Sequence, residues 1–232
     1  MHAQINPPSD FITLAKRLEA WAPLRTEVVV RNVEKCAKTF FADAQKKLRT
    51  KTGQRYRRFL GGLTCQGFYF LDQTPTVLCK SGYVLQGENG LAPLLLENLE
   101  NGFLAAGYTV VSCPDPIQPK LLAHLLVPEL ELAFVTGAVT SGLGYQTIHT
   151  ESLAEKNVWQ ENRAKLREML HLAEKEQQKA IDYLKEAKAC HDTLEELYHP
   201  YVDFKYTDQV TENVLEEILA LPDQPLATSF FL

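Results

Sequence analysis

Residues Gly82–Leu96 contain the stretch whose residue types and spacing come nearest to a phosphate-binding site. A short apolar segment, Tyr83–Gln86, leads into a glycine-containing turn, and Pro93 follows at the expected start of a helix. Backbone N–H groups of such a turn, together with the helix N-terminus, can hold a phosphate. The same order also fits an ordinary strand-to-helix turn, because proline is favoured at the first helical position. The residues of the expected phosphate loop are Gly87, Glu88, Asn89, Gly90, Leu91 and Ala92.

This loop lacks the side chains that phosphoryl transfer requires. A Walker A motif ends in Gly-Lys-Ser/Thr, and those three positions are occupied by Ala92, Pro93 and Leu94 when Gly87 is the first glycine. Pro93 provides neither an ammonium group nor a backbone N–H, and Leu94 cannot bind Mg²⁺. The segment 132–136 also ends without the aspartate of a Walker B strand. We therefore expect no catalytic residue and no cofactor, with ATP and Mg²⁺ as the alternative.

A second group of candidate ligands lies in the last turns of a long helical segment. His191, Glu195 and His199 recur every four residues, so a helix would place them on one face. Such a set could ligate a metal ion. Histidine and glutamate are also common on solvated helix faces, and His191 fits a polar position in a helix seam. The expectation is no metal site, with these three residues as the candidates.

The pattern of apolar residues divides the chain into four regions. We expect an N-terminal helical segment at 1–55, an α/β core at 56–150, a long helical arm at 151–200, and a C-terminal helix and tail at 201–232. Strands alternating with helices predict a mostly parallel sheet flanked by helices. Within the core, strands are predicted near 59–63, 67–71, 83–86, 108–113 and 131–136, and helices near 93–106 and 119–126.

Residues 152–199 predict a long helical segment, because they contain no glycine or proline and are rich in strong helix formers. A single unbroken helix and a hairpin both fit this composition. A heptad pattern places Leu166 and Leu170 in a seam, followed by several small alanines. The seam could pack on the first helices of the same chain or on a second copy in a coiled coil. We expect this arm to contact a protein partner or to form a homo-oligomer.

Composition excludes several classes of protein. The 232 residues carry a net charge of −5 with a pI near 5.7, which argues against a general nucleic-acid binder. No apolar run reaches the length of a membrane span, and the polar first ten residues do not resemble a signal peptide. Five scattered cysteines are odd in number and form no C-x-x-C pair. This pattern favours free thiols in the cytoplasm.

Short segments in a fixed order carry a family resemblance. They are 57–61, 64–68, 83–87, 113–116, 127–130 and 188–198. In these segments the chain resembles little-characterised bacterial ATPase-like proteins that carry two P-loop domains in tandem, each followed by a long helical insertion. The resemblance implies a P-loop NTPase fold and an ATPase activity. Here it covers a single domain, and Pro93 and Leu94 occupy the positions of the family's functional lysine and serine or threonine.

Two functions from different classes remain open. The first is a degenerate P-loop domain without ATPase activity that acts as a binding, regulatory or scaffold protein. The alternative is an ATP-binding ATPase or nucleotide-kinase-like enzyme whose unusual loop is completed by a partner subunit. That alternative needs an arginine or lysine to reach the Gly87–Ala92 turn from elsewhere. Binding of a nucleotide or anion by the backbone amides of 88–92, without turnover, is a third and intermediate hypothesis.

Overall fold

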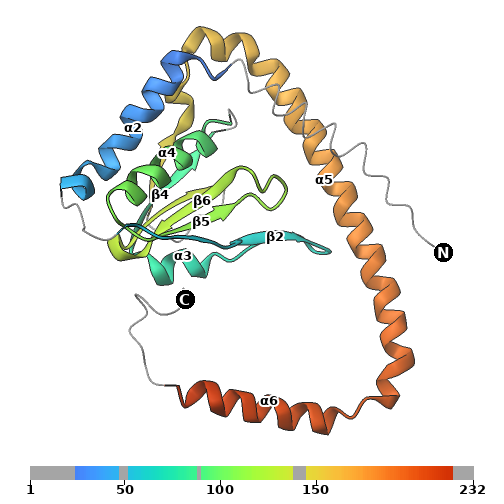
Figure 1. The fold of residues 1–232 in the computed structure, drawn as a ribbon. Coiled ribbons are helices and arrows are strands. Elements are labelled where there is room, and N and C mark those ends of the chain that lie inside the picture. Colours follow the sequence, from blue (N-terminus) through green and yellow to red (C-terminus); the bar gives the residue numbers. More distant parts are fainter. Residues whose placement is uncertain (1–23, 47–51, 88–89, 138–144, 222–232) are drawn as a thin grey trace. The chain divides into compact units, whose positions relative to one another are not determined.

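The fold is seen in a computed structural model that describes residues 24–46, 52–87, 90–137 and 145–221 (Figure 1). The chain divides into two units, Met1–Ile181 and Asp182–Leu232, and each is treated by itself. None of the helices in the described ranges combines the length and apolar character that crossing a bilayer requires.

A six-stranded, mostly parallel sheet forms the centre of the first unit, as the sequence predicted. Five strands share one direction, and β6 alone runs antiparallel to its neighbours. All five residues of β5 are buried, as expected for a strand covered on both faces. In spatial order the strands are β1 (Arg55–Arg57), β5 (Val110–Pro114), β6 (Leu122–Val127), β7 (Leu132–Thr136), β4 (Ser81–Gln86) and β8 (Gln146–His149).

One predicted helix is wrong. Residues 119–126 were expected to be helical, but Leu122–Val127 form strand β6, in the middle of the sheet between β5 and β7. Five of the six β6 residues are buried. A short run of leucines fits either a buried helix or a buried strand, and here the pairing with two neighbouring strands decides.

Two of the predicted strands lie outside the main sheet. Strands β2 (Gly61–Thr64) and β3 (Gly67–Phe70) pair with each other as an antiparallel hairpin. The turn between them has Gly67 at a φ of 113°, a conformation that favours glycine. A short helix, α3 (Gln73–Leu78), connects the hairpin to β4.

Two helices lie side by side against the sheet: α2 (Glu27–Lys46) and α4 (Ala92–Ala105) (Figure 1). Their close approach depends on Gly102, because a Cβ atom there would lie 2.3 Å from the ring of Phe41. The ring of Phe40, also on α2, packs edge-on against Tyr83 of β4 and Phe134 of β7, at centroid distances of 4.7 and 5.3 Å. The apolar core therefore lies between this helix pair and the sheet.

The predicted helical arm is one continuous helix, α5 (Lys156–Tyr198), and not a hairpin. Its first part packs on the core of the first unit, where Leu166 is buried and Trp159 and Met169 are partly buried. A hydrogen bond from Thr26 to Glu155 ties the residue before α5 to the chain just before α2. This part of α5 therefore belongs to the core of the first unit.

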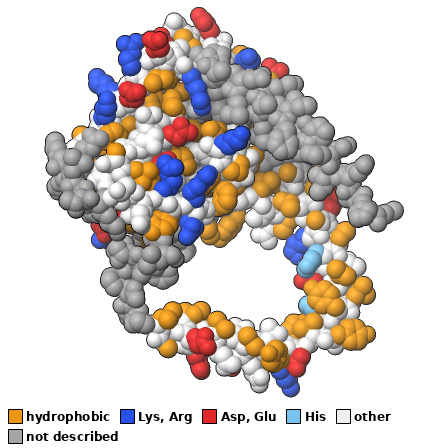
Figure 2. All heavy atoms as spheres, in the orientation of Figure 1, with side chains coloured by type: hydrophobic (Ala, Val, Ile, Leu, Met, Phe, Trp, Pro, Cys, Tyr) orange, Lys and Arg blue, Asp and Glu red, His pale blue; other side chains and the backbone are white. Residues whose placement is uncertain are grey.

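The second unit contains the end of α5, the short helix η4 (His199–Tyr201) and α6 (Phe204–Leu219). Asp203 caps α6, its carboxylate accepting a hydrogen bond from the Tyr206 N–H at 3.2 Å. All residues of α6 are exposed, and Figure 2 shows many apolar side chains along it. Its large exposed apolar residues are Phe204, Tyr206, Val210, Val214, Leu215, Ile218 and Leu219.

Candidate functional site

A crevice with a volume of about 220 Å³ lies at the carboxyl edge of the parallel strands. Strands β4, β5 and β7 all end at this edge, and the antiparallel β6 begins there. Open α/β sheets bind their ligands in this position. The walls come from the turn after β4, the first turn of α4, the segment after β5, the start of β6, the end of β7 and Leu170 of α5.

The predicted phosphate loop forms one wall. Gly87, Gly90 and Ala92 line the crevice, and Leu91 is the buried N-cap residue of α4. Glu88 and Asn89 lie outside the described residues. Gly90 has a φ of 67° and Gly87 a φ of 144°, in the region that side chains other than glycine rarely adopt. The chain can thus turn sharply from β4 into α4 because glycines occupy these two positions.

The N-terminus of α4 provides a positive potential at this wall. The first N–H groups of any helix have no partner within the helix, and they form the positive end of its dipole. Within the described residues no side chain caps α4, and its first turn contains no acidic residue. Pro93 lines the crevice and removes one N–H donor from this turn. The half-buried Leu94 packs against the core, so the position that a Walker A motif would give to a Mg²⁺ ligand is apolar.

Gln118 on the opposite wall carries an unpaired polar atom. This residue is only 8% exposed, and its side-chain oxygen Oε1 is buried without a hydrogen-bond partner. Its backbone is held firmly, because the Asp115 carboxylate accepts hydrogen bonds from the N–H groups of Ile117 and Gln118 at 2.8 and 2.9 Å. Buried amide oxygens are almost always paired. Gln118 therefore places a buried acceptor without a hydrogen-bond partner on a residue that lines the crevice.

The floor of the crevice at β7 is uncharged. Thr136 lines the crevice, and its N–H donates to Nδ1 of His124 at 3.2 Å. Burial lowers the pKa of His124 to about 4, because the charged imidazolium would lose its hydration. The ring is therefore neutral near pH 7, with its proton on Nε2. His124 stabilises the fold at this edge and does not act as a charged ligand group.

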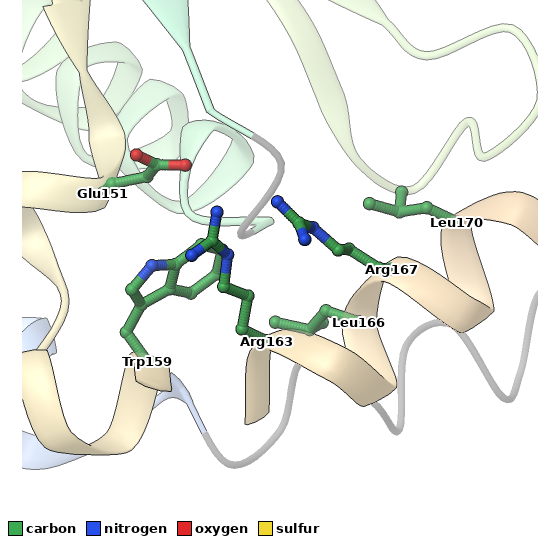
Figure 3. Close-up of a pocket in the computed structure, with 6 residues that line it drawn as sticks. All are labelled: Glu151, Trp159, Arg163, Leu166, Arg167 and Leu170. Atoms are coloured by element: carbon green, nitrogen blue, oxygen red, sulfur yellow. The ribbon is translucent and has the colours of Figure 1, made fainter. Parts of the chain in front are cut away.

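A smaller pocket of about 30 Å³ shares one lining residue with the crevice, and two arginines line this smaller pocket. Arg163 and Arg167 extend from the same side of α5 toward the side where Glu151 lies (Figure 3). Leu170 lines both this pocket and the crevice. Thr150, next to Glu151, donates its hydroxyl to the Gln86 carbonyl at the end of β4, at 3.1 Å. The side of this pocket formed by Glu151 therefore lies near the point where the chain leaves β4.

The three metal-ligand candidates are not all brought together. His191 Nδ1 and Glu195 Oε1 are 3.3 Å apart, and the third neighbouring group is Asp192. Asp192 also pairs with Lys188 at 2.6 Å. His199 lies beyond the end of α5, in η4, with its ring against Tyr198 and Phe204. The exposed His191 and the partly buried Asp192 and Glu195 form ordinary helix-surface pairs.

Comparison with known proteins found no family model, curated protein or solved structure that matches the chain. The candidate site therefore rests on its own geometry. Sequence reasoning located the wall at Gly87–Ala92 but missed Gln118, Arg163 and Arg167. The i, i+4 spacing of two arginines on a core-packed helix was the only available signal for the last two.

Proposed function

We propose that this chain is a binding domain that holds a small phosphorylated ligand at the carboxyl edge of its sheet and does not transfer the phosphoryl group. In this proposal the protein is a P-loop-like domain that has lost the ability to catalyse phosphoryl transfer. The observation that carries the proposal is the buried, unpaired Oε1 of Gln118 beside the crevice. The α4 N-terminus forms the opposite wall and favours an anion.

The two walls favour a ligand with two different chemical groups. A phosphate matches the backbone N–H groups at the start of α4, because these are donors in a positive potential. The Gln118 oxygen accepts hydrogen bonds and so matches a hydroxyl or amino group. Asp115 adds a negative charge to the lining and disfavours an anion on its own side. Phosphorylated sugars and nucleotides carry both kinds of group.

The first turn of α4 lacks the side chains that hydrolysis of a phosphate ester or anhydride requires. Catalysis of phosphoryl transfer depends on positioning, on neutralising the phosphate oxygens and on a metal ion. Pro93 and Leu94 supply neither a cation nor a hydroxyl in the first turn of α4. Backbone amides do not depend on side-chain identity, so binding can persist where turnover is lost.

Calorimetric titration of the full chain with ADP, AMP and inorganic phosphate, without Mg²⁺, tests this proposal. Gln118→Met keeps the size of the side chain and removes the acceptor, so we expect about tenfold weaker binding of the nucleotides. The matched control is Gln66→Met, the same change at an exposed turn residue, which should leave binding unchanged. Equal affinity in all three proteins, or no binding by the wild type, would refute the proposal. Mg²⁺-dependent phosphate release from ATP would instead favour an ATPase.

We further propose that the second unit is a protein-contact surface. The apolar residues of α6 are exposed, and a 16-residue helix is marginal in water unless it packs on something. A protein partner and a second copy of the chain both fit this proposal, and sedimentation of the purified protein separates them. All five cysteines are free, which suits a reducing compartment such as the cytoplasm.

A further inference from the structure

The two arginines of the smaller pocket repel each other and so slightly destabilise the helix α5 that carries them. Arg163 and Arg167 are four residues apart, and like charges at this spacing repel on a helix surface. Both are exposed, and neither forms an ion pair with a carboxylate of the described residues within 4.0 Å, although Glu151 lines the same pocket. Helix stability alone therefore gives no reason for this pair.

Their location supplies a reason. The pocket shares Leu170 with the crevice, and the Thr150–Gln86 hydrogen bond holds its Glu151 side close to the end of β4. Phosphates at the N-terminus of α4 would lack the ammonium group that a lysine at position 93 would provide. One guanidinium group can donate two parallel hydrogen bonds to two phosphate oxygens, and it keeps its positive charge at any relevant pH. Two such groups on α5 can replace the missing cation.

We propose that Arg163 and Arg167 bind the outer phosphate of a ligand with two or more linked phosphates, whose inner part lies in the crevice. This inference rests on the proposed function and adds the ligand class, a diphosphate or longer. Two guanidinium groups and the Glu151 carboxylate give the pocket a net charge of one positive unit. That balance favours an extended polyphosphate over a single phosphate already held at α4.

The test compares inorganic pyrophosphate and ADP with inorganic phosphate and AMP, by calorimetry in EDTA at constant ionic strength. The double variant Arg163→Gln with Arg167→Gln should bind pyrophosphate and ADP at least about tenfold more weakly. Its affinity for phosphate and AMP should change less than about threefold. The control double variant, Lys165→Gln with Lys175→Gln, removes the same charge from exposed positions of the same helix and should behave as the wild type.

Each outcome decides between the two proposals. An equal loss in both double variants would mean a general effect of net charge, and no loss in the arginine variant would also overturn the inference. In that second case, weaker binding by Gln118→Met would leave the proposed function standing. Absence of binding of all four ligands by the wild type would overturn both. Unchanged melting temperatures of the double variants confirm that the exposed substitutions leave the fold intact.

Discussion

Replacing Gln118 with methionine should stabilise the protein without ligand, which is the opposite of what most substitutions do. A buried amide oxygen without a partner loses its hydrogen bonds to water and regains none, at a cost of about 1–3 kcal/mol. The side chain is 92% buried and its Oε1 is unpaired, so this cost applies. Methionine has a similar size and no strong polar atom, and volume-conserving changes cost little. We expect a gain of about 1–2 kcal/mol.

Urea unfolding followed by circular dichroism measures this gain. For a chain of this size, 1–2 kcal/mol corresponds to a melting temperature higher by about 2–8 °C. Gln66→Met serves again as the control and should change stability by less than about 0.5 kcal/mol, because Gln66 is exposed. A Gln118→Met protein less stable than the wild type would show that Oε1 already has a partner. Gln118 would then give no indication of a missing ligand group.

Two further predictions concern the elements around the crevice. His124 has its pKa lowered to about 4 by burial, so stability is full above the unfolded pKa of about 6.5 and is lost as the pH falls toward 4. Between pH 8 and pH 5 the wild type should lose about 2 kcal/mol more than His124→Asn, which keeps an acceptor for the Thr136 N–H, as urea unfolding at the two pH values will show. Gly102→Ala should destabilise the protein by about 1–3 kcal/mol although alanine favours helices, because the new Cβ would meet the buried Phe41 ring. A gain in melting temperature would show that α2 can move away from α4.

The strand and helix at the phosphate-loop wall could be predicted because local signals agree there. Tyr83–Gln86 is a short apolar run, a glycine follows it, and Pro93 falls in the first turn of α4. The helical character of 152–199 followed from its composition for the same reason, whereas the sequence left open whether the segment is one helix or a hairpin. Each of these elements is recognisable from neighbouring residues alone.

Strands that depend on distant partners could not be predicted in the same way. β1 has only three residues, and it is held at the sheet edge by pairing with β5 and by the Arg55–Glu100 ion pair at 2.9 Å. β8 is a short strand, Gln146–His149, that pairs only with β4. Neither has an apolar pattern, so the sheet context determines them. The prediction for 119–126 was wrong for a related reason: neighbouring residues alone do not show that this segment is buried between two strands.

The candidate site also contains one part that local sequence predicts and another part that depends on the folded structure. The Gly87–Ala92 wall is a local motif, whereas Gln118 matters only because its side chain is buried in a folded turn beside that wall. The heptad pattern placed Leu166 and Leu170 in one seam, and both contact the first unit: Leu166 packs in its core and Leu170 lines the crevice. A coiled coil through this part of α5 stays a prediction without support. Arg163 and Arg167 can be recognised as candidate site residues only when the packing of α5 is known.

The absence of a lysine at position 93 and the proposed anion site are compatible, because they depend on different parts of the chain. The field at the α4 N-terminus comes from backbone dipoles and tolerates almost any side chain, including Leu94. A proline in the first turn even favours the start of this helix. A cation supplied from α5 would bind a phosphate from outside the loop, and Arg163 and Arg167 would then tie ligand binding to the position of that helix.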